Sequence, residues 1–530
     1  MRALPSRRQF LTVAAAGIAA ATLPTGANAA AGTSNGLRWP AGQALPTFAR
    51  PRFLDVADLT GRSADEQLLL TTLQGLVNRD RPSIYLLQPQ NEGPTTWLTE
   101  LGVPYQQVST PLDLLTRYRA QVHGAIVHDP AVPATVNVAT TLAGLHDAVA
   151  TSAELAQSTG LPVLVDLRGR FTTDLAAYTW AVDNLWNSTS HRLLIGLDPN
   201  VSGYLRDYAV ANKAMVVFLD PATAGEGPLL SGLLADLPSP APYLGWWPAS
   251  VNGEDDGTQL TSQHGVYVLA ADWCTNLTVL GGVPAPVRPG QYAPPPPPLA
   301  NKIYVTLTMT EGDNLQYGQH RMRQIWDDPN RGKVPLNWTT QPLAIDAAPT
   351  VLSYYQRTAS PNDYLMAGPS GAGYIYPSDW PAATLARYTA QAADYTRRTG
   401  LNAQVILNRL NGADIPFDQA TATRYTQDLR PLGLLMAWTN HTDTSVLAGD
   451  TPLSVSWLAS SVSEATQAIA TASADWTGTE PMFLSIGTLA WNLTPTDAMT
   501  IANSLGPHYQ VVRGDHYFAL ARKALGLPAH

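Results

Sequence analysis

Two acidic side chains, Glu311 and Asp313, lie two residues apart directly after an apolar run at 303–309. If the extended backbone of that run continues, side chains at positions i and i+2 point to the same side. Two neighbouring carboxyl groups raise each other's proton affinity, so that one can act as an acid while the other is ionised. Glycoside cleavage uses this division of labour, and both residues are therefore our leading catalytic candidates. Two alternatives stay open, because the same run offers oxygen ligands to a divalent cation and also suits an Asx turn.

Further candidates come from residues that follow other predicted strands. Ligands of parallel α/β proteins bind beyond the carboxyl ends of the strands, so polar and aromatic residues there are candidates for the site. Three carboxylates are reserves for the catalytic pair, namely Asp363, Asp443 and Asp515. The candidates for substrate binding are Asn314, Gln316, Ser370, Tyr374, Tyr376, Arg409, Asn411, Trp438, His441, Trp491 and His516.

The aromatic candidates are expected to line sugar subsites. The chain has 21 Tyr and 14 Trp against 8 Phe. This excess suits a cleft whose rings stack and also form hydrogen bonds, although filling a large core is an alternative use. Tyr374 and Tyr376 form a stacking platform after a glycine-rich run, or they cover a tight loop. Arg409 and Asn411 are expected to bind sugar hydroxyls or a uronate.

Signals for other chemistries are weaker. His441 and Asp443 could join Asp515 and His516 in a metal site, but the spacing of a zinc motif is absent, and we expect no metal. We interpret Asp515 and His516 as a structural hydrogen-bonding pair. Ser370 lies in a Gly-Pro-Ser-Gly-Ala-Gly run, a near miss to a nucleophile elbow, which keeps an esterase open as an alternative.

The composition excludes several classes of protein. With 45% hydrophobic and only 14% charged residues, the chain does not have the composition of a disordered, highly solvated protein. Its length of 530 residues predicts two to four domains. A net charge of −9 argues against a nucleic-acid-binding protein. The single cysteine, Cys274, excludes an intramolecular disulfide framework and multi-cysteine metal centres. No dinucleotide or phosphate-loop fingerprint is present, and we expect no cofactor.

The C-terminal 230 residues alternate regularly between apolar runs and amphipathic stretches. This pattern predicts an α/β domain, most simply a (β/α)₈ barrel, with an open doubly wound sheet as the alternative. The predicted strands are 303–309, 336–341, 363–366, 403–407, 434–438, 453–456, 482–486 and 509–512. The predicted helices are 347–356, 382–398, 420–429, 461–472, 495–504 and 518–524.

The region before the barrel also reads as α/β, with one or two small parallel-sheet domains over 37–283 and a split near residue 200. Predicted strands there are 53–56, 83–87, 124–127, 162–167, 192–195, 214–219 and 266–270, and predicted helices are 64–77, 140–156 and 174–185. Five consecutive prolines lie within 284–300, which we interpret as a linker before a C-terminal catalytic domain at 301–530.

The N-terminus has the features of an export signal. A twin-arginine pair at Arg7 and Arg8 precedes an apolar stretch at 11–23, and small residues follow at 27–29. The stretch is too short to span a bilayer, so no stable membrane anchor is expected. We predict a signal peptide at 1–29 and a bacterial protein that reaches the cell envelope or the extracellular space.

Several segments carry a resemblance to one family. Residues 371–377 read Gly-Ala-Gly-Tyr-Ile-Tyr-Pro, which matches the motif GxGYxYP letter for letter. The runs at 311–316, 331–338, 362–364, 73–79 and 82–86 also resemble this family, with Glu311 where the family more often has Asp. The chain is thus identified as a member of the GxGYxYP family of bacterial proteins, which are classed as glycoside hydrolases, and no established catalytic pair carries over from it.

Together these observations predict an exported glycoside hydrolase that acts on an oligosaccharide or polysaccharide. One alternative is a carbohydrate-binding protein without catalysis. The other is an esterase or deacetylase that acts on decorated polysaccharide.

Overall fold

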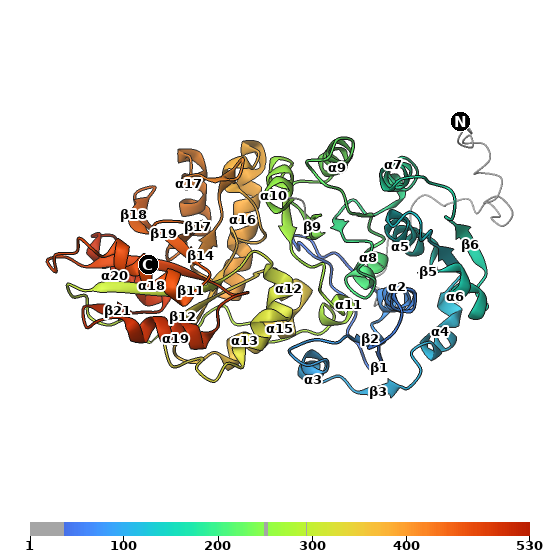
Figure 1. The fold of residues 1–530 in the computed structure, drawn as a ribbon, viewed down its shortest axis with the longest axis horizontal. Helices are drawn as coiled ribbons and strands as arrows, with labels where there is room; N and C mark the ends of the chain where they lie inside the picture. Colours follow the sequence, from blue (N-terminus) through green and yellow to red (C-terminus); the bar gives the residue numbers. More distant parts are fainter. Residues whose placement is uncertain (1–35, 249–252, 293) are drawn as a thin grey trace. The chain divides into compact units, whose positions relative to one another are not determined.

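The computed structural model of the protein describes residues 36–248, 253–292 and 294–530 (Figure 1). The described chain is an α/β protein in which three small parallel sheets precede a larger parallel barrel. The predicted signal peptide lies outside the described residues. Within the described part, no helix is long and apolar enough to cross a membrane.

The first two sheets each have three parallel strands. Their orders are β2-β1-β3 and β5-β4-β6. The strands are β1 (Leu54–Asp58), β2 (Ile84–Leu87), β3 (Tyr105–Val108), β4 (Ala125–Val127), β5 (Val149–Thr151) and β6 (Val163–Asp166). The helices among them are α2 (Ala64–Asp80), α3 (Thr96–Leu101), α4 (Asp113–Arg117), α5 (Ala134–His146), α6 (Ala153–Ser158) and α7 (Asp174–Leu185).

The third sheet has four parallel strands in the order β10-β9-β7-β8. These are β7 (Leu194–Gly196), β8 (Val216–Val217), β9 (Ala241–Gly245) and β10 (Val266–Leu269). Its helices are α8 (Arg206–Asn212), α9 (Glu226–Ala235), α10 (Gly253–Gln263) and α11 (Leu277–Leu280). The sequence predicted only one or two such sheets, because strands of two to five residues leave little periodicity to count.

One predicted helix in this region is wrong. The segment 140–156 contains the end of α5, the whole of β5 and the start of α6. Asp147 ends α5 in the left-handed conformation, and the buried strand Val149–Thr151 follows directly. Such a short apolar run cannot be told from a buried helical turn by periodicity alone.

The C-terminal region is a closed barrel of seven parallel strands. Its strands are β11 (Ile303–Thr310), β12 (Leu336–Thr340), β13 (Asp363–Ala367), β14 (Gln404–Ile406), β17 (Leu434–Thr439), β19 (Thr451–Ala459) and β20 (Met482–Leu489). All eight residues of β11 are buried, which is typical of a parallel strand covered on both faces.

The eighth predicted strand, β21 (Tyr509–Val511), exists but does not complete an eight-stranded barrel. It pairs only with the first three residues of β11, whereas β12 closes the barrel by pairing further along, at Thr308 and Met309. The chain turns away after β21 because Gly514 begins a helix, and its N–H donates to the Asn337 side chain of β12.

The barrel helices largely follow the prediction. They are α12 (Asn314–Gln319), α13 (Arg321–Trp326), α14 (Ala344–Ala347), α15 (Pro349–Thr358), α16 (Ala382–Thr399), α17 (Gln419–Arg424), α18 (Val462–Ala472), α19 (Pro495–Ser504) and α20 (Gly514–Ala524). Helices α12, α13 and α14 were not predicted. Nor were a short hairpin of β15 (Arg409–Leu410) and β16 (Ala413–Asp414), and an antiparallel strand β18 (Asp443–Leu447) beside β19.

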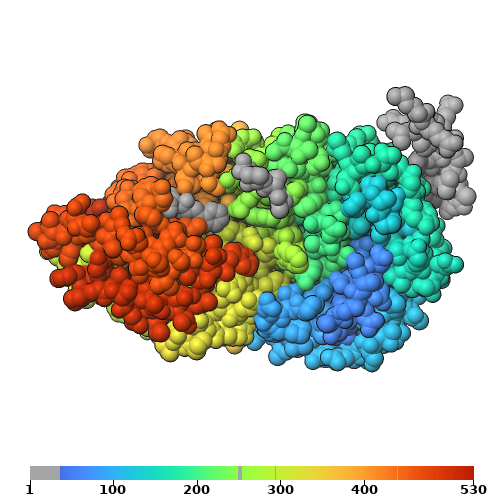
Figure 2. All heavy atoms as spheres, in the orientation of Figure 1, coloured from blue at the N-terminus to red at the C-terminus, as the bar shows by residue number. Residues whose placement is uncertain are grey.

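The third sheet lies directly against the barrel, which Figure 2 shows as green segments beside yellow and orange ones. Val268 of β10 and Tyr374 exchange both backbone hydrogen bonds, so strand β10 and the loop after β13 are joined. The backbone N–H of Gln316 on α12 also donates to Ala270 O just after β10. The two carboxyl ends, of β10 and of β11, therefore meet.

Candidate functional site

Four carboxyl groups interact where the third sheet meets the barrel. Glu311 and Asp313 follow β11, as expected from the sequence. Asp272 follows β10 of the third sheet, and Glu254 lies in the first turn of α10. The charge of Asp313 raises the pKa of each of the other three. The barrel and the preceding domain thus contribute to one acidic cluster, which we define as Glu254, Asp272, Glu311 and Asp313.

Asp313 is at the centre of this cluster. It occupies the N-cap position of α12, and Gln316 Nε2 donates to its Oδ2 at 3.1 Å. Burial raises the pKa of the Asp313 carboxyl, while the Gln316 hydrogen bond acts in the opposite direction. The side chain is only partly exposed, so its charge acts through a medium of low polarity on its neighbours.

Glu254 is a partly buried acid. Burial raises its pKa to about 7, and the charges of Asp313 and Asp255 add to that effect. The Tyr374 hydroxyl donates to Glu254 Oε1 at 2.9 Å and favours the charged form. A carboxyl group with a pKa near neutrality exchanges its proton at the pH where most enzymes work.

Asp272 is a second partly buried acid whose pKa is raised in the same way. Burial raises its pKa to about 7, and the charge of Asp313 is the next cause. Its Oδ1 is buried and has no hydrogen-bond partner among the described residues. Gln316 connects this segment to α12, because its Oε1 accepts the Trp273 backbone N–H at 2.8 Å.

Glu311 does not face solvent as a catalytic partner of Asp313. Only 1% of the residue is exposed, and neither carboxyl oxygen has a hydrogen-bond partner in the described chain. Burial raises its pKa well above the ordinary value, with Asp313 and Glu254 adding to the rise. The i, i+2 argument fails here because Asp313 already belongs to the start of α12, so the two side chains do not extend from one strand.

The two tyrosines of the GxGYxYP motif are not a stacking platform. Tyr374 and Tyr376 are buried, and their rings lie 5.8 Å apart at an interplanar angle of 79°. Their hydroxyls instead hold acidic side chains of α10, since Tyr376 donates to Asp255 Oδ1 at 2.6 Å while Tyr374 bonds Glu254. The motif therefore fixes the first turn of α10 against the barrel.

The second glycine of the motif allows this close approach. Gly373 has a φ of 132°, and a Cβ atom there would lie 2.5 Å from the ring of Tyr267 on β10. The Tyr376 backbone N–H also donates to Ser262 Oγ on α10 at 2.9 Å.

Arg409 and Asn411 lie at the same junction but are already engaged. Arg409 forms ion pairs with Asp255 and Asp414 and donates to Gly412 O. Asn411 exchanges hydrogen bonds with Gln259 of α10. Arg409 is thus a neutralised structural cation, and the uronate-binding role predicted for it has no support in this arrangement.

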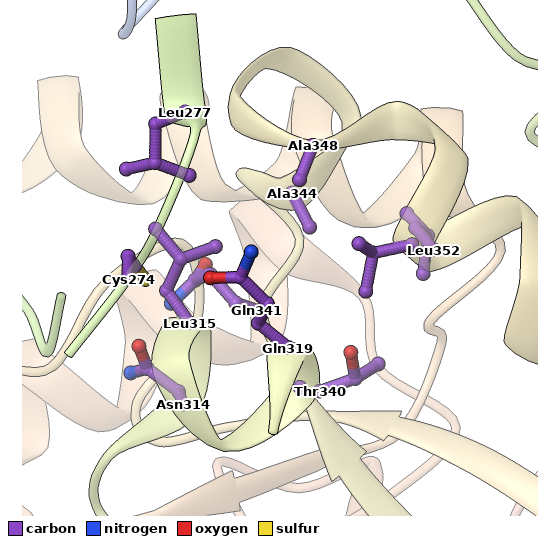
Figure 3. Close-up of a pocket in the computed structure, with 12 residues that line it drawn as sticks. Cys274, Leu277, Asn314, Leu315, Gln319, Thr340, Gln341, Ala344, Ala348 and Leu352 are labelled. Carbon is purple, nitrogen blue, oxygen red and sulfur yellow. The ribbon is translucent and has the colours of Figure 1, made fainter. Parts of the chain in front are cut away.

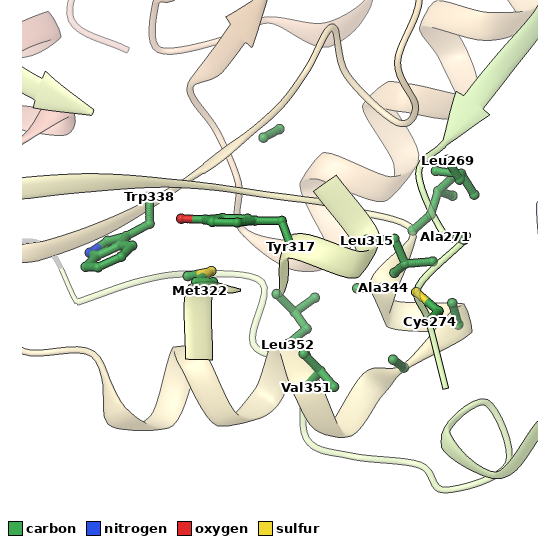
Figure 4. Close-up of a cluster of buried hydrophobic side chains, with 14 of the residues drawn as sticks. Leu269, Ala271, Cys274, Leu315, Tyr317, Met322, Trp338, Ala344, Val351 and Leu352 are labelled. Atoms are coloured by element: carbon green, nitrogen blue, oxygen red, sulfur yellow. The ribbon is translucent and has the colours of Figure 1, made fainter. Parts of the chain in front are cut away.

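Asn314 and Gln316 are buried beside the cluster. Asn314 lines a cavity of about 10 Å³ together with Gln341, Gln319 and Cys274, and Figure 3 shows the amide groups at its wall. Neither amide atom of Asn314 has a partner in the described chain, and a space of this size is at the lower limit for one water molecule. An apolar cluster lies alongside, with Tyr317 next to Trp338 and Met322 in Figure 4.

Two exposed tryptophans lie on chain segments that neighbour acids of the cluster. Trp273 directly follows Asp272 and is 48% exposed. Trp491 is 45% exposed and follows Ala490, whose N–H donates to Thr310 O immediately before Glu311. Its ring packs edge-on against Tyr317 at 6.1 Å. Trp491 therefore lies where the sequence predicted it, whereas Trp273 was not predicted.

Asp363 and Asp515 lie away from the cluster. Asp363 is the first residue of β13, at the amino end of the barrel, where it pairs with Arg331 and accepts from Trp338 Nε1. Asp515 pairs with Arg513, whose guanidinium also donates to Pro361 O just before β13. Both reserves are engaged in ion pairs, Asp363 at the start of β13 and Asp515 in the first turn of α20, and neither lies at the carboxyl end of β11 with the cluster.

His516 and Ser370 have structural contacts as well. The His516 ring bonds Pro294 O in the proline-rich segment, and its predicted role in substrate binding stays a prediction. Ser370 is completely buried, and its Oγ donates to Leu407 O and accepts the Leu407 N–H. A buried hydroxyl that is held by two backbone hydrogen bonds is not available as a nucleophile. These contacts therefore argue against the nucleophile-elbow interpretation.

The remaining candidates follow strand β17. His441 is exposed, and Asp443 is the exposed first residue of β18. Trp438 belongs to β17, but its side chain lies outside the described part of the structure. Among the described residues, no group of three or more His, Cys, Asp or Glu side chains is arranged to hold a metal ion.

Sequence reasoning missed the two acids from outside the barrel. Asp272 follows the strand predicted at 266–270, so reading strand ends in the N-terminal region as well would have found it. Glu254 belongs to a run of three acids at 254–256, which is typical of the first turn of a helix. The run does not predict that Glu254 contacts the barrel.

By its fold the protein is a parallel α/β-barrel protein, and its acidic cluster lies at the carboxyl end of the first barrel strand, where such proteins bind ligands. The comparisons with known proteins then identify the family, and the chain belongs to the GxGYxYP family. Its residues 301–522 match the GxGYxYP putative glycoside hydrolase C-terminal domain. The first, second and third N-terminal domains of the family match 53–120, 122–189 and 191–282.

A solved structure has the same fold. It is described as a putative hydrolase from Bacteroides thetaiotaomicron VPI-5482 and superimposes with a TM-score of 0.80 at 23% identity. The match covers 92% of this chain and 99% of the other. No curated protein matches the sequence.

Proposed function

We propose that the protein is an exported glycoside hydrolase whose active site is shared between the barrel and the third N-terminal domain. The observation that carries the proposal is the pair of partly exposed acids, Glu254 and Asp272, each with a pKa of about 7 beside Asp313. Membership of a family classed with glycoside hydrolases supports the same reaction.

The electrostatics assign different roles to the acids. Burial, with the charge of Asp313 added to it, raises the pKa of Glu254 and of Asp272, and we assign Asp313 as the group that ionises first. Glu254 then acts as the general acid that protonates the glycosidic oxygen, with Tyr374 fixing its carboxyl group. Asp313 acts on the other side of the scissile bond, as the nucleophile or as the base that activates water.

The exposed tryptophans supply the sugar-binding surfaces. Trp273 directly follows Asp272, and Trp491 follows the residue that bonds Thr310 just before Glu311. Flat indole rings stack on the apolar faces of sugars while leaving the hydroxyls free. They take the role that the sequence assigned to Tyr374 and Tyr376. The predicted substrate, an oligosaccharide or polysaccharide, would lie across the two domains.

The proposed location is outside the cytoplasm. The twin-arginine pair and the short apolar stretch at 11–23 support export of the folded protein. Polymeric glycans are accessible to an enzyme of the cell envelope or the extracellular space, which agrees with this location.

The test is release of reducing sugar from a panel of polysaccharides and oligosaccharides by the wild type and two variants. Asp313→Asn removes the charge that adds to the raised pKa of both acids, and a loss of kcat of at least about 100-fold is expected. Asp256→Asn is the matched control, because Asp256 lies on α10 yet Asp313 is not among the charges that raise its pKa. Equal turnover by Asp313→Asn and the wild type would refute the proposal, and glycan binding without turnover would favour a carbohydrate-binding protein.

A further inference from the structure

We propose that the ring of His320, the carboxyl group of Glu92 and the backbone oxygen of Trp273 form a proton-dependent latch between the barrel and two N-terminal domains. The latch is closed while the imidazole and the carboxyl group together hold two protons, and it loosens when one of them leaves. It concerns how the domains are joined and is independent of the proposed reaction.

The ring of His320 contacts two other domains. His320 lies between α12 and α13 of the barrel. Its Nδ1 atom lies 2.6 Å from Oε1 of Glu92, which follows β2 in the first domain. Its Nε2 atom lies 2.9 Å from the backbone oxygen of Trp273, which follows β10 in the third domain. One imidazole thus joins three parts of the chain.

The two oxygen acceptors determine how many protons the latch needs. A backbone oxygen only accepts hydrogen bonds, so Nε2 of His320 must carry a proton. The contact between Nδ1 and Glu92 Oε1 needs a second proton, which resides either on the ring or on the carboxyl group. If this proton leaves, a lone pair of Nδ1 faces a carboxylate oxygen, and the attraction turns into repulsion.

Burial makes the loss of this contact costly. The side chain of Glu92 is 1% exposed and that of His320 is 12% exposed. Glu92 Oε2 is buried without a hydrogen-bond partner, and within the described chain the ion-pair partner of Glu92 is His320 alone. A buried carboxylate that loses its partner strongly destabilises its surroundings. The segment around Glu92 should therefore move towards solvent when the latch opens.

The other titratable groups around the latch do not explain such a change at Glu92. Three buried or partly buried tyrosines feel its charge, namely Tyr85, Tyr204 and Tyr355. Burial is the main cause that raises their pKa and the Glu92 charge adds to it, so they stay neutral near pH 7. Arg321 is turned to the barrel, where it donates to Ala490 O. Burial raises the pKa of Asp272 to about 7, so this neighbour of Trp273 needs a control of its own.

The remaining contacts of this junction do not titrate. Gln316 Oε1 accepts the Trp273 N–H at 2.8 Å, and the Gln319 side chain exchanges hydrogen bonds with the backbone of Thr275. Trp97 Nε1 also donates to Gln319 O at 2.6 Å. These contacts keep the domains together, so loss of the proton should loosen two segments without unfolding the protein.

Hydrogen–deuterium exchange of the mature wild-type protein at pH 6 and pH 9 tests the latch. The readouts are the segments 88–96 and 271–276, with rates corrected for the intrinsic effect of pH on exchange. We expect the corrected exchange of 88–96 to be at least about threefold faster at pH 9, with a smaller rise in 271–276.

Three variants make the result specific. Glu92→Gln supplies an amide N–H that can donate to an unprotonated Nδ1, so 88–96 should exchange slowly at both pH values. His320→Gln removes the imidazole, and 88–96 should exchange fast at both pH values. Asp272→Asn removes the other group that titrates near pH 7, and it should keep the pH dependence of 88–96.

Equal corrected exchange of the wild type at pH 6 and pH 9 would overturn the inference. The same holds if Glu92→Gln or His320→Gln keeps the pH dependence of the wild type. Loss of the dependence in Asp272→Asn would assign the effect to Asp272 and also overturn the latch. The wild-type comparison needs no substitution, so the latch can be tested even if a variant does not fold.

Discussion

The hydroxyl of Tyr374 links the family motif to the proposed acid. It donates to Glu254 Oε1 and thereby lowers the pKa of a carboxyl group that burial raises to about 7. Tyr374→Phe removes only this hydroxyl from a completely buried ring. The pKa of Glu254 should therefore rise, and the descending limb of the kcat–pH profile should move to higher pH.

A matched variant separates this effect from loss of a buried hydrogen bond. Tyr304→Phe also removes the hydroxyl of a buried tyrosine, but that hydroxyl bonds the backbone near residue 300. Each substitution should cost about 1 kcal/mol of unfolding free energy, and only Tyr374→Phe should move the profile. An unchanged limb in Tyr374→Phe would show that Glu254 is not the acid.

Glu311 should make stability fall as the pH rises. Its raised pKa means that the folded protein holds this proton at pH values where the unfolded chain has lost it. Above the ordinary pKa of a glutamate, unfolding therefore releases a proton, and the free energy of unfolding falls by about 1.4 kcal/mol per pH unit up to the folded pKa. Glu311→Gln removes this dependence.

Thermal unfolding between pH 4 and pH 8 measures the effect. The melting temperature of Glu311→Gln, relative to the wild type, should increase steadily from pH 4 to pH 8. Glu464→Gln is a control of opposite sign, because backbone and side-chain hydrogen bonds from Ser460 lower the pKa of Glu464. The stability from Glu464 is present above the ordinary pKa and lost as the pH falls, so this variant should be less stable than the wild type near neutrality. A constant offset between Glu311→Gln and the wild type would contradict the account.

Among the elements, the loop after β13 is the one that joins two domains. Gly373 has a positive φ, and a Cβ atom would overlap the ring of Tyr267 on β10. Gly373→Ala should therefore cost about 3 kcal/mol or more in chemical denaturation and reduce activity, since it separates Glu254 from the barrel.

The control for this prediction is Gly232→Ala on α9. A Cβ atom at Gly232 meets nothing within 4 Å, and alanine favours a helix over glycine by up to about 1 kcal/mol. This variant should be as stable as the wild type or slightly more stable. If Gly373→Ala behaves in the same way, the close approach of the motif to β10 is not required.

The elements themselves were largely predictable from the sequence. The seven barrel strands and β21 were predicted within a few residues, because most of them are buried apolar runs separated by amphipathic helices. Strand β21 shows the limit of this reasoning. Its pattern is that of the other strands, yet its pairing with only three residues of β11 depends on where the chain turns at Gly514.

For the whole molecule, the decisive contacts join segments far apart in the sequence. Asp313 was chosen from its place after β11, and Arg409 and Asn411 were chosen from their places after β14; their roles stay predictions. Their partners Glu254 and Asp255 come from α10, about 60 and 150 residues earlier, and nothing in the local pattern indicates that α10 packs on the barrel. A sequence read strand by strand therefore finds the half of the site that the barrel supplies.

The central claim is that one active site is built by both domains, and the most direct test is the kcat of Glu254→Gln on the best glycan substrate. Glu254 lies outside the barrel domain and is held by Tyr374 of the motif. We expect a loss of kcat of at least about 100-fold, with little change in KM, and an unchanged kcat for Asp256→Asn. Wild-type turnover by Glu254→Gln would contradict this claim and confine the catalytic groups to the barrel.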